Sequence, residues 1–165
     1  MSIAKLHTLL VELPGRVLGN FESLLLLATR VWVSWEFLKS GWIKIGSWQN
    51  TVFLFQNEYR VPVLPPYLAA VAGTAGELVF PALLIAGIAG RLSAMGLLAV
   101  NVMAVVSYAH VLLTEGFEAA VGQHYLWGFA LLVLAVLGPG RISVDHWVGS
   151  SLVGERPAVL KARMA

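Results

Sequence analysis

Polar side chains interrupt the long apolar stretches of this sequence, and several are of types that can do chemistry. The candidates that can exchange a proton, hydrogen-bond a ligand or stack against one are Arg30, Glu36, Lys39, Glu77, Tyr108, His110, His124 and Trp127. Ionisable side chains are costly inside a membrane, so they usually face the protein interior and have a partner. We therefore expect ligand binding or proton exchange at these residues. No nucleophile paired with a base identifies a catalytic residue.

Arg30 and Glu77 both fall near the middle of apolar stretches that are expected to form neighbouring antiparallel helices. This placement predicts an Arg30–Glu77 ion pair. Such a pair can be purely structural, because buried ion pairs often fix helix register more than they stabilise a fold. The functional alternative makes Glu77 a proton acceptor or a polar anchor for a ligand.

The remaining polar candidates are expected near one end of the bundle. Glu36 and Lys39 are three residues apart on one helix face and predict a local ion pair, with the lysine extending toward the interface. Tyr108, His110 and His124 fall at the same level on other helices. Together they predict a polar cavity in the outer half of the bundle. The alternative is that the histidines only hydrogen-bond backbone or lipid headgroups.

No residue spacing predicts a metal site. His110 and His124 are the only histidines that could ligate a haem iron from facing helices, or a copper ion together with a methionine. Two histidines alone are not a metal motif, and both lie close to a membrane face. We therefore expect neither haem nor copper. The sequence dictates no cofactor, and quinone is the one that the predicted cavity would suit, because histidine can hydrogen-bond a quinone carbonyl.

Composition excludes several classes of protein. The chain has 165 residues, of which 58% are hydrophobic and only 12% charged, and its mean hydropathy is +0.78. Soluble domains carry about 25% charged residues, so an ordinary soluble enzyme and a disordered chain are excluded. A net charge of +2 is too small for a nucleic-acid surface. With no cysteine, the chain has no disulfide, thiolate zinc site or Fe–S cluster of its own.

The elements that must position the candidates are membrane helices. Apolar runs of about 20 residues can cross the hydrocarbon core, and they occur at 21–43, 67–89, 92–113 and 119–138. We predict an all-α integral membrane four-helix bundle of residues 21–148. A cytoplasmic segment of residues 1–20 precedes it, and a cytoplasmic tail of residues 149–165 follows.

A short amphipathic helix is expected between the first two spans. One helical face carries apolar residues at an i, i+4, i+7, i+11 spacing, namely Trp48, Val52, Phe55 and Tyr59. Ser47 is the expected N-cap, and prolines from Pro62 onward end the helix. The helix would lie at the interface or fold over the mouth of the bundle.

The distribution of lysine and arginine predicts the topology. One side would carry Lys5, Arg16, Arg91, Arg141, Arg156, Lys161 and Arg163. The other side would hold Lys44 and Arg60, with Lys39 near the outer end of the first helix, and its loop at residues 114–117 has neither lysine nor arginine. By the positive-inside rule, both termini are cytoplasmic.

Several segments together resemble the DoxX family of small bacterial membrane proteins, over about residues 21–148. They are FLKSGWIKI (37–45), LFQNEYRVPVLPP (54–66), AGELVFPALL (75–84), GIAGR (87–91), HYLWG (124–128) and GPGRISVDHW (138–147). The positions that match the family pattern are Arg30, Lys39, Gly41, Lys44, Glu58, Tyr59, Glu77, Pro81, His124, Trp127, Arg141 and Asp145. Of these, Asp145 is expected to cap a helix or to pair with Arg141 at the cytoplasmic face.

The resemblance implies a four-helix bundle in the bacterial inner membrane and a link to redox metabolism. The family takes its name from a subunit of an archaeal terminal quinol oxidase, and related chains belong to thiosulfate:quinone oxidoreductase. The subgroup with the pattern LFxxEYxVPxLPP resembles chains found beside copper-responsive, bufferin-type systems. Metal or sulfur stress is therefore a plausible setting. Some redox-linked relatives carry cysteines, whereas this chain has none.

The leading hypothesis is a non-catalytic subunit or accessory protein of a quinone-linked respiratory or redox system. Its expected partners are membrane lipids, other membrane or periplasmic redox proteins and further copies of the chain, but no nucleic acid. The alternative is a component of a small-solute or metal transporter that works as an oligomer. If the chain is itself an enzyme, it is expected to be a quinone-linked oxidoreductase.

Overall fold

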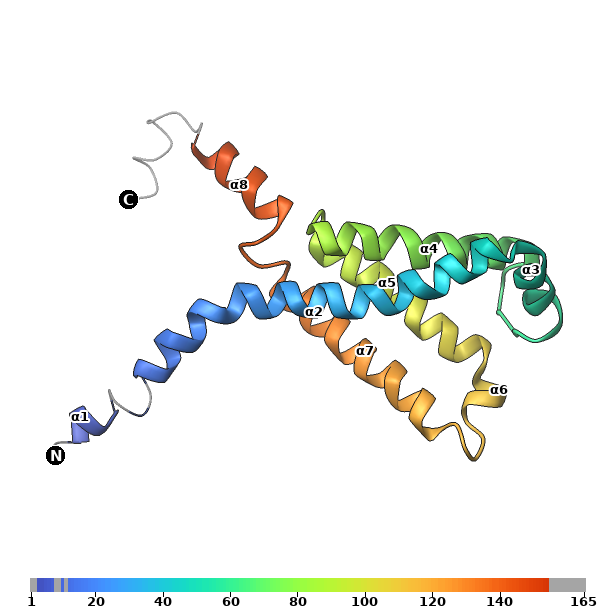
Figure 1. Ribbon diagram of the computed structural model, residues 1–165, viewed down its shortest axis with the longest axis horizontal. Helices are drawn as coiled ribbons and strands as arrows, with labels where there is room; N and C mark the ends of the chain where they lie inside the picture. Colours follow the sequence, from blue (N-terminus) through green and yellow to red (C-terminus); the bar gives the residue numbers. More distant parts are fainter. Residues whose placement is uncertain (1–2, 8–9, 11, 155–165) are drawn as a thin grey trace.

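The computed structural model describes residues 3–7, 10 and 12–154, and this part of the chain is helical, with no strand (Figure 1). The helices are α1 (Ile3–His7), α2 (Leu13–Gly46), α3 (Trp48–Asn57), α4 (Pro66–Ala86), α5 (Gly90–Ser107), α6 (Ala109–Leu112), α7 (Glu118–Leu137) and α8 (Val144–Gly154). The all-α prediction is confirmed, and the short helix predicted between the first two long ones is present as α3.

Three helices of the described part, α4, α5 and α7, are long and apolar enough to cross a membrane. The longest helix, α2, has 34 residues, and it carries four of the chain's charged side chains between residues 30 and 44. At 1.5 Å per residue it is about 50 Å long, well beyond the roughly 30 Å of a hydrocarbon core. Three of the four predicted spans therefore have the length and composition of membrane helices. The remaining span, predicted at residues 21–43 within α2, stays a prediction.

The long helices pack as neighbours around one apolar core. α2 packs along α4, and α5 packs against both α4 and α7, as Figure 1 shows. The buried core residues are Leu26, Val33, Phe37, Leu84, Ala94, Leu97, Leu131 and Leu134. Close approach of α4 to α5 depends on Gly76, because an added Cβ there would lie 2.7 Å from Val100 Cγ2. Small residues at helix contacts are typical of membrane bundles.

Two predicted helix ends were wrong. The second span was expected to continue to Ala89, but α4 ends at Ala86 because Gly87 adopts a left-handed conformation with φ of 70°. The third was expected to reach Leu113, but α5 ends at Ser107. The carbonyl of Ser107 accepts the backbone N–H of Arg60 rather than an N–H of the next helical turn. This contact separates α5 from α6 and ties the α3–α4 loop to the end of α5.

Helix α3 folds back over the first turns of α4. The predicted apolar face is the one that packs here, since Phe55 is buried against Ala69 and Ala70. Ser47 is the N-cap residue of α3, as predicted, but its side chain makes no capping hydrogen bond. The Ser47 N–H still bonds to the Ile43 carbonyl, so the chain passes from α2 into α3 with little interruption.

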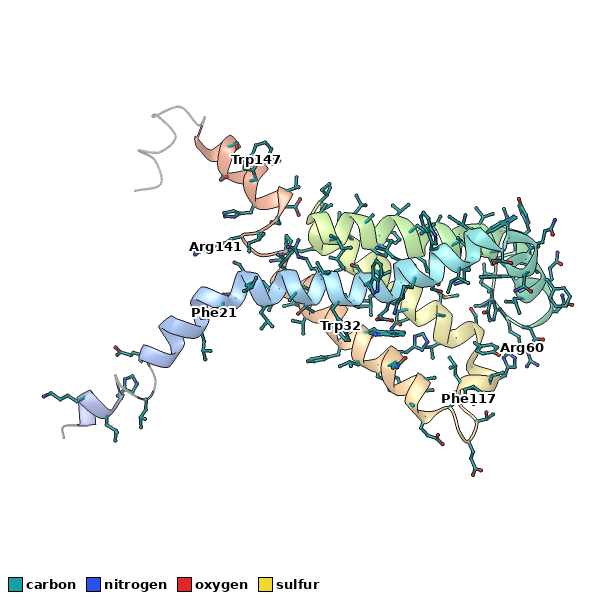
Figure 2. The ribbon with its side chains drawn as sticks, viewed as in Figure 1. Phe21, Trp32, Arg60, Phe117, Arg141 and Trp147 are labelled. Atoms are coloured by element: carbon teal, nitrogen blue, oxygen red, sulfur yellow. The ribbon has the colours of Figure 1, made fainter. Side chains whose placement is uncertain are left out.

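The first turns of α2 and the whole of α8 leave the bundle at the same end (Figure 1). Arg141 lies at this end and Arg60 at the opposite one (Figure 2). The predicted tail of residues 149–165 begins inside α8, and its residues 155–165 lie outside the described residues. Residues 1–2, 8–9 and 11 of the predicted N-terminal segment also lie outside them.

Candidate functional site

A buried ion pair joins α2 and α4. Lys44, in the last turn of α2, donates to Glu77 Oε1, and the two side chains are only 20% and 7% exposed. The helices come this close because Gly41 has no side chain: an added Cβ would lie 2.8 Å from Leu78 Cγ and 3.2 Å from Glu77 Cβ. Glu77 Oε2 is buried and has no hydrogen-bond partner among the described residues. The pair therefore holds a charged donor in place while one carboxylate oxygen stays unsatisfied.

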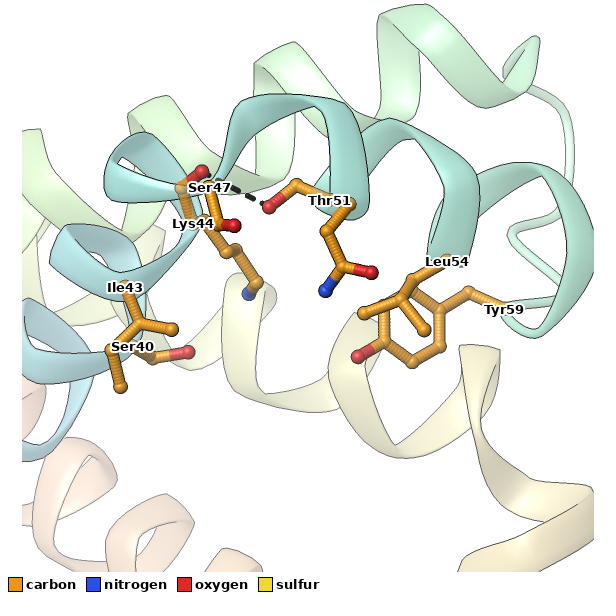
Figure 3. A pocket seen from close by; sticks show the side chains of 8 residues that line it. Ser40, Ile43, Lys44, Ser47, Thr51, Leu54 and Tyr59 are labelled. Atoms are coloured by element: carbon orange, nitrogen blue, oxygen red, sulfur yellow. Dashed lines mark hydrogen bonds between the residues drawn. The ribbon is translucent and has the colours of Figure 1, made fainter.

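A pocket of about 180 Å³ opens beside Lys44, at the corner where α2 turns into α3 (Figure 3). Its lining combines hydroxyl, amide and ammonium groups with apolar side chains, from Ser40, Ile43, Lys44, Ser47, Asn50, Thr51, Leu54 and Tyr59. Thr51 Oγ1 donates to the Lys44 carbonyl at 3.0 Å, which fixes the corner. Figure 3 shows the Lys44 side chain and the Tyr59 hydroxyl on the same side of this corner.

Tyr59 follows the end of α3 and lies outside the candidate membrane spans. Its ring makes edge contacts with Phe55 at 4.9 Å and Tyr108 at 5.3 Å between centroids. Burial raises the pKa of the Tyr59 hydroxyl above its ordinary value, and Tyr108, Glu77 and Glu58 raise it further. The hydroxyl therefore stays protonated, and remains a hydrogen-bond donor, throughout the neutral pH range.

The predicted Arg30–Glu77 pair was wrong. Arg30 is fully buried, but its guanidinium donates to two backbone carbonyls, that of Leu84 at 3.3 Å and that of Ile142. The error was in register: Arg30 lies at the C-terminal end of α4, beside Gly87, whereas Gly41 lies opposite Glu77. Lys44, about four turns of helix beyond Arg30, takes the place that the sequence prediction gave to the arginine. A guanidinium at a helix C-terminus is also favoured by the helix dipole.

The local Glu36–Lys39 pair was correctly predicted, with Lys39 Nζ 2.7 Å from Glu36 Oε2 and both side chains partly exposed. The residues that were expected to line one wider cavity around this pair instead form separate groups. Tyr108 contacts His110 at 5.5 Å and Tyr59 on its other side. His124 instead contacts Trp127, at 5.0 Å between centroids. No interaction among the described residues joins His110 to His124.

Asn101, on α5, positions His124 on α7. Its side-chain amide donates to the His124 carbonyl at 3.0 Å, and its Oδ1 lies 2.8 Å from His124 Nδ1. Since Oδ1 can only accept, Nδ1 carries the proton, and in the neutral ring Nε2 is left as an acceptor. Asn101 is buried, and Gly128 leaves room for its amide, 3.3 Å from where a Cβ would lie. Trp127 in turn packs edge-on against Phe37 of α2.

Asp145 and Arg141 lie at the end of the bundle away from the pocket. One of the two expectations for Asp145 was that it caps a helix, and it does so. The helix is α5, since the Asp145 carboxylate accepts the N–H groups of Ala89 at 2.8 Å and Gly90 at 2.7 Å. The backbone N–H of Arg141 donates to Ser23 Oγ at 3.2 Å. These contacts hold the α7–α8 connection against α2 and α5. They are hydrogen bonds that satisfy backbone N–H groups at and between helix ends.

No group of three or more His, Asp or Glu side chains that could hold a metal ion occurs in the described part of the chain. Comparison with known proteins gives a family. The DoxX family model matches residues 25–110, about half of the chain. The chain belongs to the DoxX family.

This DoxX protein is similar to an uncharacterized protein of Haemophilus influenzae. The two are 29% identical over 133 residues, which cover 78% of this chain and 84% of the relative. No solved structure matches the chain. Family membership and the apolar helices together make it a multi-pass membrane protein.

The matched region contains the whole pocket and the ion pair beside it, whereas His124, Trp127, Arg141 and Asp145 lie beyond it. Three residues of these sites were not among the predicted ligand and proton candidates: Lys44, Tyr59 and Asn101. Lys44 and Tyr59 were named only as positions that match the family pattern. Asn101 is polar in the middle of an apolar run, which is itself a signal.

Proposed function

We propose that this DoxX protein is a quinone-binding accessory subunit of a membrane redox system, and that the pocket between α2 and α3 receives the quinone ring. The observation that carries the proposal is the pairing of two fixed donors with apolar walls in a pocket of a membrane protein. Lys44 offers ammonium N–H groups, Tyr59 offers a hydroxyl, and Ile43 and Leu54 supply apolar surface. A quinone has two carbonyl oxygens that accept hydrogen bonds and a ring that prefers apolar contact.

The size of the pocket supports one small ring. A cavity of about 150 Å³ holds a benzene molecule, and this pocket has about 180 Å³. The space therefore suits a substituted six-membered ring whose tail extends outward into lipid.

The charge balance also suits a neutral ligand. Glu77 compensates the positive charge of Lys44, so the pocket presents hydrogen-bond donors without a net charge that would favour an anion. Ion pairing leaves the other N–H groups of Lys44 available, because an ammonium has three. The activity we propose is an accessory role beside a catalytic redox protein.

In this proposal the protein lies in the bacterial inner membrane with both termini in the cytoplasm and the pocket toward the periplasm. Support comes from the lysine and arginine distribution. The first turns of α2 and α8 also leave the bundle at one end. The proposed partners are membrane or periplasmic redox proteins, with metal or sulfur stress as the setting.

Quinone binding can be tested on protein purified in mild detergent and depleted of native quinone. A benzoquinone with a short alkyl tail is titrated while quenching of tryptophan fluorescence is followed. Loss of one hydrogen bond costs about 1 kcal/mol, so Tyr59→Phe should weaken binding roughly fivefold. Tyr125→Phe, at an exposed position on α7, is the matched control and should bind like the wild type. Wild-type protein that does not bind, or Tyr59→Phe that binds equally well, would overturn the proposal.

A second candidate function is a component of an oligomeric transporter, and the buried Lys44–Glu77 pair favours it. Buried ionisable pairs in membrane proteins often mark ion or proton pathways. Reconstituted protein that lacks quinone binding but carries protons or metal ions across vesicles, with flux lost in Glu77→Gln protein that circular dichroism shows to be folded, would favour this function over the first.

A further inference from the structure

We infer that α8 is a membrane-surface helix that lies on the lipid leaflet at the end of the bundle away from the pocket. The inference is independent of quinone binding. It concerns a helix whose residues from 149 onward were predicted to belong to a cytoplasmic tail, and it names the lipid interface as the binding partner of this helix.

The start of α8 is fixed at a membrane boundary. The carboxylate of Asp145 holds the N–H groups of Ala89 and Gly90, and its backbone N–H donates to the Gly87 carbonyl at 3.0 Å. These three partners form the short turn between α4 and α5, two helices that are long and apolar enough to span a membrane. Such a turn lies where the chain leaves the hydrocarbon core. The first turn of α8 therefore lies there too.

One face of α8 is apolar and exposed. Val144, Trp147 and Val148 follow an i, i+3, i+4 spacing and are 39%, 71% and 42% exposed. We call these three residues the α8 stripe. Figure 1 shows α8 extending away from the other helices of the described part, in agreement with the exposure of the stripe. Asp145 and His146 lie off this stripe, which makes the described part of the helix amphipathic.

The polar groups near the stripe are suited to an interface. The hydroxyls of Ser150 and Ser151 both donate to the Trp147 carbonyl, at 2.8 and 3.0 Å, so neither needs water as an acceptor for its proton. Tryptophan is the residue most typical of the boundary between lipid and water. Arg141 is exposed just before the helix and can interact with anionic headgroups. Lipid therefore fits the stripe better than bulk water does.

The absence of cysteine makes a direct test simple, because a single introduced cysteine can carry a spin label. We would label Val148→Cys and His146→Cys in separate full-length proteins. These positions lie on opposite sides of the helix, about 200° apart, and both are exposed. Each protein is reconstituted in vesicles of phosphatidylethanolamine and phosphatidylglycerol. Collision rates with oxygen, which concentrates in lipid, and with a water-soluble nickel chelate are then measured by electron paramagnetic resonance.

The inference predicts that the label at residue 148 meets oxygen several-fold more, relative to the nickel chelate, than the label at residue 146. Equal access of the nickel chelate to both labels would show that α8 projects into water and would overturn the inference. A label at residue 148 that neither reagent reaches would show that protein covers the stripe, and this result would also overturn it. Thermal unfolding of both labelled proteins at the wild-type temperature confirms that neither substitution has disturbed the fold.

Discussion

Lys44 and Glu77 form an ion pair across the α2–α4 interface, one helical turn from the glycine that lets the two helices approach. The pair adjoins the pocket at the corner between α2 and α3. A buried pair of this kind is costly to break, because removing one partner leaves the other charge without compensation. It therefore determines both the stability of this end of the bundle and the position of a donor in the pocket.

Glu77→Gln should destabilise the protein by about 3–5 kcal/mol, the usual cost of leaving a buried charge unpaired. Thermal unfolding in detergent, followed by circular dichroism, would show it as a clear fall in Tm. Replacing both partners, in a Lys44→Met and Glu77→Leu double variant, should recover much of the loss, since no buried charge remains. If Glu77→Gln unfolds at the wild-type temperature, the ion pair does not contribute as we describe.

A second prediction concerns pH and Tyr59. Its pKa in the folded protein lies above the ordinary 10.0, mainly because the hydroxyl is buried. A raised folded-state pKa means that the protonated form is favoured by folding. Its contribution to stability is therefore fully present below pH 10 and is lost as the pH rises through the folded-state pKa. The free energy of unfolding should fall above about pH 10, and quinone binding should not change between pH 6 and 9 through this group.

Absorbance of the phenolate ion during alkaline titration can check this. The chain has four tyrosines, and Tyr59→Phe should remove the one that titrates latest. Tyr125→Phe removes an exposed tyrosine and should leave the late transition in place. Loss of an early transition in Tyr59→Phe would contradict the prediction.

Much of the fold could be predicted from the sequence because apolar length and helical periodicity are local properties. The positions of the long helices followed from runs of apolar residues, and the face of α3 followed from the spacing of Trp48, Val52 and Phe55. Helix ends were less predictable. The end of α5 depends on a hydrogen bond between Ser107 and Arg60, which are 47 residues apart by their numbers in the chain.

The candidate site was harder to predict because it depends on register between helices. Counting from the ends of apolar runs placed Arg30 and Glu77 at one depth, but α2 begins well before the bundle and shifts the register by about three turns. Glu36 and Lys39, whose contact lies within one helix, were paired correctly. A pair within one helix can be derived from the spacing of its residues. A pair between two helices can be derived only when the packing of the helices is known, and here glycines set the distance between them.

A third prediction tests Asp145 as the cap of α5. Asp145→Ala removes the acceptor for two N–H groups at the helix start and should cost about 0.5–2 kcal/mol. Asp145→Asn keeps one side-chain oxygen and should cost less. His146→Ala, at the next and exposed position, is the control and should leave Tm unchanged in thermal unfolding. Equal Tm values for Asp145→Ala and the wild type would show that the cap does not stabilise α5.

The fourth prediction concerns the ring of His124. With Asn101 Oδ1 facing Nδ1, the neutral ring should carry its proton on Nδ1, and ¹⁵N NMR of labelled histidine should show an unprotonated Nε2. Asn101→Leu removes both hydrogen bonds while keeping a similar volume. It should destabilise the protein by about 1–3 kcal/mol and release the ring to a mixture of tautomers. His110, which contacts Tyr108 instead, should keep its signals in the variant and is the internal control. A wild-type spectrum with the proton on Nε2 of His124 would mean that Asn101 does not set the tautomer. The ring nitrogen of His124 that acts as the acceptor would then be Nδ1 rather than Nε2.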